Sequence, residues 1–137
     1  MTSKVFLDTS YAIALASPHD LSYSPARRLA AEIKAQSTRL VTTRAVLLEI
    51  GNSLSKRRFR HAAVTLLQSL ETDPHVEIIG LTGELYSAAF KLFRERPDKE
   101  WGLVDCISCV VMQERGLTQV LTTDEHFAQM GFQVLLK

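Results

Sequence analysis

The sequence predicts an α/β domain built on a mainly parallel central sheet of about four to five short strands, with helices on both faces. Short apolar runs, several rich in β-branched residues, alternate along the chain with longer segments whose apolar residues recur at helical spacing. Chains that alternate in this way form parallel strands joined by right-handed crossovers. Because no linker, repeat or low-complexity segment divides the chain, we expect a single domain over residues 1–137.

Composition places the chain among soluble globular proteins. Of the 137 residues, 46% are hydrophobic and 23% are charged, which excludes a disordered chain. No apolar stretch approaches the roughly 20 residues needed to cross a bilayer. Two cysteines are too few for a secreted disulfide scaffold. Since Asp8 interrupts an N-terminal stretch that faintly imitates a signal peptide, we expect a cytoplasmic protein.

The first half of the chain is expected to hold two strands and four helices. The apolar run over 4–8 predicts a buried strand, and Thr9 or Ser10 would cap a helix that ends at Ala16. The next elements follow from hydrophobic spacing and from the stop signal Asp73-Pro74. They are a helix over about 21–37 with Leu21, Leu29 and Ile33 facing inward, a strand over 39–43, a helix over 44–56 and a helix from about 60.

The second half is expected to hold three strands and three helices. Thr82 can cap a helix that runs to about Arg96, and Gly116 suits the C-terminal cap of a helix that ends at Glu114. The elements, in order, are a strand over 76–79, the helix over 82–96, a polar loop over 97–102, a helix from 104 or 105, a strand over 119–123, a helix over 125–130 and a strand over 132–136.

Four acids occupy positions at which this fold would gather or bury carboxylates. Asp8 ends the first strand and Asp124 follows the fourth. Parallel strands end at the same edge of a sheet, where ligands bind. Asp105 opens an apolar helix, and Glu49 lies beside the apolar stripe of another. Each acid alone has an ordinary structural explanation: a helix cap, a turn, or an ion pair with a nearby arginine.

The joint occurrence of these acids favours a metal site. A carboxylate among apolar groups is costly unless it is paired or binds a metal. Mutual repulsion between carboxylates is relieved by divalent cations, and oxygen ligands favour Mg²⁺ or Mn²⁺ over zinc. One or two such ions activate water and neutralise the charge that develops on a phosphodiester.

Four segments that contain these acids make the chain similar to a known family. Their acids follow one another at intervals of 41, 56 and 19 residues. The segments are Val5-Phe6-Leu7-Asp8-Thr9-Ser10, Thr43-Arg44-Ala45-Val46-Leu47-Leu48-Glu49-Ile50-Gly51-Asn52, Trp101-Gly102-Leu103-Val104-Asp105-Cys106-Ile107-Ser108 and Leu121-Thr122-Thr123-Asp124-Glu125-His126-Phe127. In these segments and in their order, the whole chain resembles the PIN-domain family, specifically the small VapC-like ribonuclease toxins of type II toxin–antitoxin pairs.

The resemblance implies an Mg²⁺- or Mn²⁺-dependent endoribonuclease that uses water as the nucleophile and leaves 5′-phosphate and 3′-hydroxyl ends. Asp8, Glu49 and Asp105 match the core acids of the family, and Asp124 matches its more variable fourth acid. We expect Asp8 and Asp105 to be the main metal ligands. Glu49 and Asp124 would act directly or through water.

Three polar residues are candidates for supporting roles. Thr9 and Ser10 follow the first acid, as small hydroxylated residues do in the family, and are expected to orient Asp8 by hydrogen bonds. Asn52 lies one helical turn beyond Glu49 on the same face. It could contact metal-bound water or remain an ordinary exposed amide.

The net charge of +1 is unevenly distributed along the chain. Residues 27–60 carry +7, whereas residues 61–137 carry −5. A basic region of this kind suits RNA phosphates, although a solvated helix face is the ordinary alternative. The candidates for phosphate binding are Arg44, Lys56, Arg57, Arg58 and Arg60.

The resemblance also implies protein partners. VapC-like proteins are usually homodimers and are inhibited by a small antitoxin whose C-terminal segment lies in a groove by the active site. The helices predicted over about 21–37 and 44–56 are candidates for lining that groove. A PIN ribonuclease that acts in RNA maturation without an antitoxin is the nearest alternative.

A C-x-x-C motif offers an alternative from another class, a thiol redox protein. Cys106 and Cys109 lie in an apolar helix, where cysteine behaves as a small core hydrophobe, so we favour a structural role for both. No paired spacing typical of a metal site occurs among the four histidines, His19, His61, His75 and His126. We therefore expect the histidines to be structural or surface groups.

Overall fold

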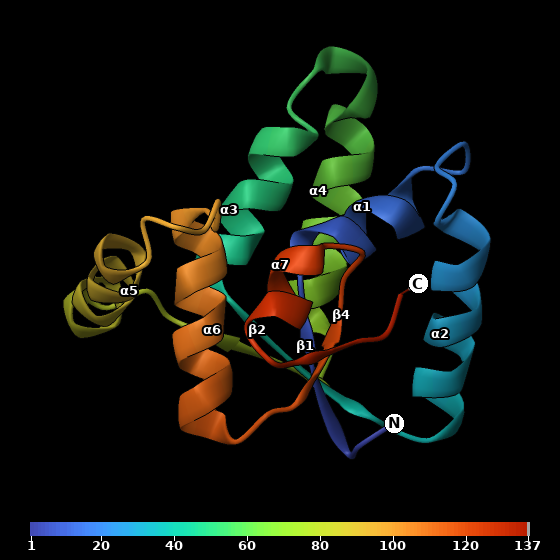
Figure 1. The fold of residues 1–137 in the computed structure, drawn as a ribbon. Helices are drawn as coiled ribbons and strands as arrows, with labels where there is room; N and C mark the ends of the chain where they lie inside the picture. Colours follow the sequence, from blue (N-terminus) through green and yellow to red (C-terminus); the bar gives the residue numbers. More distant parts are fainter. Residues whose placement is uncertain (137) are drawn as a thin grey trace.

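Five short strands form one parallel sheet in the order β3-β2-β1-β4-β5 (Figure 1). The computed structural model describes residues 1–136. The strands are β1 (Lys4–Leu7), β2 (Arg39–Thr43), β3 (Val76–Ile79), β4 (Gln119–Leu121) and β5 (Gln133–Val134). The α/β class predicted from the sequence is confirmed.

Seven helices connect and cover these strands within residues 1–136. Helices α1, α2 and α4 pack over one face of the sheet, whereas α6 covers the other and α5 packs on the outer side of α6 (Figure 1). The helices are α1 (Thr9–Ala16), α2 (Tyr23–Ala35), α3 (Arg44–Ser53), α4 (Arg57–Thr72), α5 (Gly83–Glu95), α6 (Leu103–Arg115) and α7 (Glu125–Gln129).

The central strand β1 is buried on both faces. Val5 and Phe6 point to opposite sides of the sheet, yet both are fully buried. Phe6 lies opposite Val41 of β2 and Val120 of β4. A strand covered by helices on both faces must be continuously apolar, which is why the run before Asp8 contains no polar alternation. This burial fixes the position at which β1 ends and Asp8 begins.

Several predicted boundaries differ from the observed ones. Helix α2 begins at Tyr23, and Leu21, expected to face inward, is fully exposed in the turn before it. The helix predicted over 44–56 ends at Ser53, and α4 begins at Arg57 rather than near 60. Apolar spacing missed this break because buried Leu54, which caps α3, continues the stripe of that helix into the turn.

Two further differences concern the edge of the sheet that carries the acids. Asp8, rather than Thr9 or Ser10, occupies the N-cap position of α1. Strand β4 ends at Leu121, two residues before the predicted end, and β5 is reduced to two residues. The short end of β4 leaves Thr122 outside the ladder, where its side chain can bond to neighbouring groups. No helix among residues 1–136 is both long and apolar enough to span a bilayer.

Candidate metal centre

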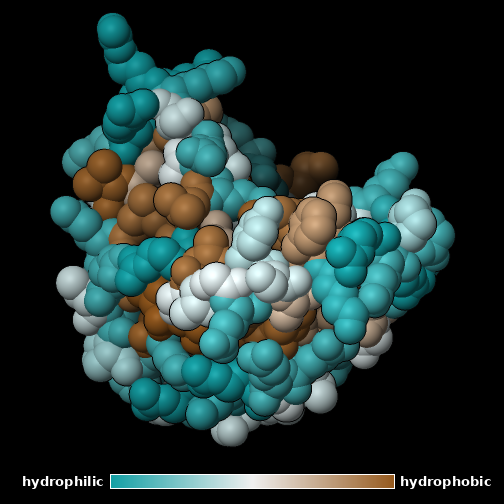
Figure 2. Space-filling view, turned by 90° about the vertical axis from the view of Figure 1, so that its left-hand side faces the viewer, coloured by the Kyte–Doolittle hydropathy of each residue, from teal (hydrophilic) through white to brown (hydrophobic). Residues whose placement is uncertain are grey.

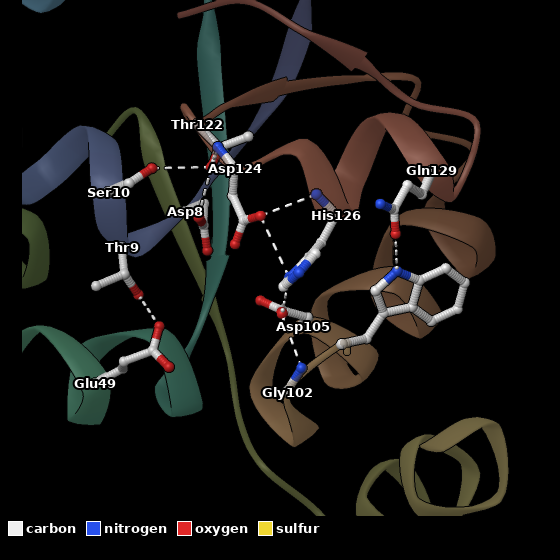
Figure 3. Close-up of polar contacts among 11 residues, drawn as sticks. Asp8, Thr9, Ser10, Glu49, Gly102, Asp105, Thr122, Asp124, His126 and Gln129 are labelled. Carbon is white, nitrogen blue, oxygen red and sulfur yellow. Dashed lines mark hydrogen bonds and ion pairs between the residues drawn. The ribbon is translucent and has the colours of Figure 1, made fainter. Parts of the chain in front are cut away.

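The carboxyl ends of β1 and β4 bring two of the predicted acids together. Asp8 follows β1, and its backbone N–H donates to the carbonyl of Leu121, the last residue of β4, at 3.2 Å. The Thr122 hydroxyl donates to Asp8 Oδ2 at 2.7 Å and accepts from the backbone N–H of Asp124 at 3.0 Å. Thr122 therefore ties Asp8 to the turn that carries Asp124, and both carboxylates are directed toward the same space (Figure 3).

Helix α6 contributes the third acid from its first turn. The backbone N–H of Gly102 donates to Asp105 Oδ2 at 3.0 Å, which holds the carboxylate at the start of the helix. The same oxygen lies 3.1 Å from Nδ1 of His126. The His126 ring also lies 3.3 Å from Asp124 Oδ1, so one imidazole links the acids of α6 and of the β4–α7 turn (Figure 3).

Helix α3 contributes the fourth acid. Its start is fixed by the Thr43 hydroxyl, which caps the backbone N–H of Val46 at 3.1 Å, and its buried side is anchored by Val46 and Ile50. Glu49 therefore lies at the edge of the buried side. The Thr9 hydroxyl donates to Glu49 Oε1 at 2.5 Å, which ties Glu49 to the residue that follows Asp8.

The Asp8 carboxyl is the most strongly perturbed of the four. It is only 4% exposed, and this burial raises its pKa from about 3.8 to about 6. Hydrogen bonds from the Thr122 hydroxyl and the Thr9 backbone oppose the rise, whereas the negative charges of Asp105 and Glu49 add to it. The carboxylates of Asp105 and Glu49 therefore lie close enough to repel that of Asp8.

The pKa of Asp105 is also raised, mainly by burial and in part by the negative charge of Asp124. Hydrogen bonds from Gly102 and His126 reduce this shift. Within residues 1–136, no lysine or arginine forms an ion pair with any of the four acids. One buried and three half-buried carboxylates without a lysine or arginine partner have the donor chemistry of a divalent metal site.

Comparison with known proteins identifies the family to which this arrangement belongs. The model of the PIN domain matches residues 5–133. The chain belongs to the PIN-domain family. The resemblance seen in the four acidic segments is confirmed.

Two relatives extend this result. The chain is 27% identical over 128 residues to the 23S rRNA-specific endonuclease VapC20 of Mycobacterium tuberculosis, covering 93% of this chain and 95% of VapC20. The crystal structure of that VapC20, described as a sarcin-ricin loop cleaving toxin, matches with a TM-score of 0.84 and 26% identity over the same shares. VapBC2 from Rickettsia felis, bound to a promoter DNA fragment, matches with a TM-score of 0.67 over 96% of each chain. At 16% identity, this last match shows the fold alone.

The three candidate supporting residues of this PIN domain differ in how they contact the acids. Thr9 contacts Asp8 through its backbone, and its hydroxyl bonds to Glu49. The Ser10 hydroxyl lies 2.8 Å from the Thr122 hydroxyl and accepts from the backbone N–H of Thr123 at 3.0 Å, so it reaches Asp8 only through Thr122. Asn52 is exposed on α3, one turn beyond Glu49.

Sequence reasoning missed two residues of the site. The sequence pattern places Thr122 inside a predicted strand, and His126 has no second histidine at a ligand-like spacing. The partners of His126 are acids, one of them 21 positions away, so a search for paired histidines could not find it. The available signal was Asp124-x-His126 at a predicted helix start, since the two side chains flanking such a start lie close together.

The basic candidates lie mainly at the turn between α3 and α4, which projects beyond the carboxyl end of the sheet (Figure 1). Arg58 stacks over Phe59, with 4.7 Å between its guanidinium carbon and the ring centroid, and Arg60 donates to the Ser55 carbonyl at 2.6 Å. Lys56 and Arg57 are exposed beside them. Arg44 instead pairs with Glu71 of α4.

The C-x-x-C motif has no exposed thiol. Cys106 and Cys109 are both buried and unbridged in α6. Burial raises the pKa of both thiols, that of Cys106 to about 11. Since the thiolate is the reactive form, the environment of this motif disfavours thiol redox chemistry.

Proposed function

We propose that this chain is an Mg²⁺- or Mn²⁺-dependent endoribonuclease and the toxin of a type II toxin–antitoxin pair that acts in the cytoplasm. The PIN fold and the similarity to a 23S rRNA-specific endonuclease support this proposal. One observation carries it: Asp8, Glu49, Asp105 and Asp124 converge from four separate segments without a lysine or arginine partner.

The residues of the site divide the chemical work. When bound, the metal supplies an acidified water and neutralises charge on the phosphodiester. Asp8 and Asp105 would be the main ligands, since one carboxylate is buried and the other half-buried, and both have raised pKa values. Glu49 and Asp124 flank them and complete the acidic pocket. Thr122 holds the Asp8 carboxylate in one orientation, and Thr9 does the same for Glu49.

The projecting α3–α4 turn is the proposed RNA-binding surface. Its four basic residues stand at the same end of the molecule as the acids, where they offset the repulsion between RNA phosphates and carboxylates. Arg44 is not part of this surface, because its guanidinium pairs with Glu71. The four residues are Lys56, Arg57, Arg58 and Arg60.

Cleavage of total RNA by the purified protein tests the proposed activity. We expect defined fragments with Mn²⁺, none with chelator, and at least a 100-fold loss of rate in Asp8→Asn. Asp98→Asn, which changes an exposed aspartate, is the matched control and should cleave like the wild type. Cleavage that persists with chelator, or undiminished in Asp8→Asn, would contradict the mechanism.

A large apolar cavity is the proposed site of the antitoxin. It has a volume of about 470 Å³ and lies between α1, α2, α4 and the sheet, with Leu7, the neighbour of Asp8, in its wall. Helix α2 lines this cavity through Ala30 and Ile33, whereas no residue of α3 is among its lining residues. Ala30→Glu should abolish inhibition by the cognate antitoxin while RNA cleavage persists; unchanged inhibition would place the antitoxin elsewhere.

The outer face of α5 is the proposed homodimer interface. Tyr86, Phe90 and Phe93 are exposed along one side of this helix, at 45%, 42% and 44%. The rings of Tyr86 and Phe90 are nearly parallel, with centroids 6.3 Å apart. On the side of the molecule that faces the viewer in Figure 2, hydrophobic side chains gather in groups bordered by hydrophilic ones. An exposed aromatic stripe of this kind is typical of an interface.

The stripe on α5 suits a second copy of the same chain, because an aromatic face of this kind can pack against its own copy. If two α5 helices pair antiparallel about a two-fold axis near Phe90, Tyr86 faces the partner's Phe93. Light scattering should show a dimer that Phe90→Glu converts to a monomer. Leu21→Glu, at a fully exposed leucine elsewhere, should leave the dimer intact; a Phe90→Glu protein that stays dimeric would refute this interface.

A further inference from the structure

We infer that His126 is a direct nitrogen ligand of the metal and that it makes the site prefer Mn²⁺ over Mg²⁺. This inference rests on the proposed metal-dependent function and adds to it the identity of one ligand and of the preferred ion. His126 belongs to the fourth acidic segment, and its contacts with Asp105 and Asp124 are formed only in the folded chain.

The first support is the position of the imidazole. His126 Nδ1 lies 3.1 Å from Asp105 Oδ2 and 3.3 Å from Asp124 Oδ1 (Figure 3). The three atoms belong to two separate segments, α6 and the start of α7, that are brought together only by folding. The backbone N–H of His126 donates to Asp124 Oδ1 at 2.9 Å, which fixes the residue relative to Asp124.

The second support is the spacing of the donor atoms. All three candidate ligand atoms lie within 4.8 Å of one another. In an octahedral site with metal–ligand bonds of about 2.1 Å, adjacent ligands are about 3.0 Å apart. The two observed nitrogen–oxygen distances, 3.1 and 3.3 Å, are close to that value. Asp105, Asp124 and His126 can therefore share one ion with little movement of their side chains.

The third support is the chemistry of the donors. Mg²⁺ binds oxygen ligands almost exclusively and releases its water reluctantly. Transition-metal ions accept imidazole nitrogen beside carboxylate oxygen, and Mn²⁺ combines this with the affinity for carboxylate and water oxygen that it shares with Mg²⁺. A set of two carboxylates and one imidazole, next to the buried carboxylate of Asp8, thus favours Mn²⁺ more than an all-carboxylate set would.

The competing interpretation gives His126 a structural role. The ring would then only hydrogen-bond to Asp105 and Asp124 and would remain uncoordinated when the ion binds. The two roles differ in an observable way, because only a coordinated nitrogen transfers electron spin density from Mn²⁺ to its own nucleus.

Pulsed electron paramagnetic resonance of the full chain with Mn²⁺ alone separates these roles. We expect nitrogen modulation in the wild type that changes from the ¹⁴N to the ¹⁵N pattern when the protein is labelled with ¹⁵N-histidine. The modulation should disappear in His126→Gln and persist in the matched control His19→Gln, an exposed histidine far along the chain. The ratio of Mg²⁺ to Mn²⁺ dissociation constants should fall about tenfold in His126→Gln.

The outcomes also separate this inference from the proposed function. Mn²⁺ binding that depends on Asp105 but shows no histidine nitrogen in the wild type would overturn the role of His126 and leave the nuclease proposal standing. Mn²⁺ binding that is unchanged in Asp105→Asn would overturn both. The labelled wild-type spectrum decides the question by itself, so it does not depend on whether His126→Gln folds.

Discussion

Acidic residues occur in two contrasting settings in this protein. At the surface, Arg115 donates to both carboxylate oxygens of Glu77 at 3.0 and 2.8 Å, and Arg96 donates to both oxygens of Asp98 at 3.0 Å. These hydrogen bonds lower the pKa of Glu77 and lower that of Asp98 to about 2. At the carboxyl edge of the sheet, burial instead raises the pKa of Asp8 to about 6.

This difference in pKa distinguishes the carboxylates that are already paired with an arginine from those that can bind a metal ion. A paired surface acid is already neutralised by its arginine and gains little from a metal. Asp8 is buried and Asp105 half-buried, both without a lysine or arginine partner, so burial disfavours their charged forms until a cation binds. The repulsion between carboxylates is therefore concentrated at the carboxyl edge of the sheet. Binding of a metal ion there would relieve it.

The largest expected effect is the pH dependence of the metal-free protein. Because the pKa of Asp8 is raised in the folded state, its protonated form stabilises the fold. This contribution is fully present below about pH 4 and is lost as the pH rises through 6. With chelator, a shift from about 3.8 to about 6 corresponds to up to about 3 kcal/mol of unfolding free energy.

Asp8→Asn separates the contribution of Asp8 to the pH dependence of the unfolding free energy from the contributions of all other acids. The variant has no ionisable group at this position, so its metal-free unfolding free energy should exceed that of the wild type at pH 8, and the gap should narrow toward pH 4. Urea unfolding at several pH values with chelator measures both curves. If the two proteins gave parallel curves of unfolding free energy against pH, the charged form of Asp8 would not be disfavoured in the folded state.

A slightly smaller effect is expected from the metal itself. An ion that binds only the folded state at 100 times its dissociation constant stabilises that state by about 2.7 kcal/mol. Thermal unfolding with Mn²⁺ should therefore show a raised melting temperature in the wild type and in Asp98→Asn, and little change in Asp105→Asn. Equal stabilisation of both variants would mean that Mn²⁺ binds outside the acidic edge.

A substitution at Thr122 tests the role of the Asp8 carboxylate without removing its charge. Thr122→Val preserves shape but removes the hydroxyl that bonds to Asp8 and accepts from Asp124. Loss of such an orienting contact reduces metal affinity or activity about 10- to 100-fold. The control is Thr42→Val, which removes another fully buried hydroxyl, one that donates to the Leu7 carbonyl at 2.9 Å.

Initial rates on a labelled RNA, with saturating Mn²⁺, compare the two threonine variants. Thr42→Val is expected to lose stability but to keep its cleavage rate, because its hydroxyl bonds only to the backbone. Equal rate losses in both variants would indicate a general effect of buried hydroxyl loss rather than orientation of Asp8.

The acidic edge could largely be predicted from sequence because it follows from topology. Once β1 and β4 are identified as parallel neighbours, Asp8 and Asp124 must emerge at the same edge. Asp105 and Glu49 follow from the cost of placing carboxylates beside apolar helix faces. These inferences need only the local pattern around each acid and the rule that parallel strands end together.

The remaining details depend on side-chain contacts between distant segments. The bond from Ser10 to Thr122 spans 112 positions, and that from His126 to Asp105 spans 21, and neither leaves a periodic trace in the sequence. The inward position predicted for Leu21 failed for a related reason, since the chain forms a turn before α2 that exposes it. Sequence patterns locate helices and strands, whereas the contact partners of individual side chains depend on how those elements pack.

The smallest expected effect comes from breaking a surface pair. Glu77 and Arg115 lie on the exterior, with 46% and 41% of their side chains exposed, so solvent and salt screen their attraction. Glu77→Gln should lower the unfolding free energy by less than about 1 kcal/mol and should leave Mn²⁺ binding and RNA cleavage unchanged.

Urea unfolding at low and high salt checks this prediction, since the small loss should shrink further as salt increases. The sign is the informative part: neutralising Glu77 should slightly destabilise the metal-free protein at pH 8, whereas neutralising Asp8 should stabilise it. If both substitutions lowered the unfolding free energy of the metal-free protein, the charged Asp8 carboxylate would be stabilised by contacts within the chain, as Glu77 is. Asp8 would then not depend on a metal ion for its stabilisation.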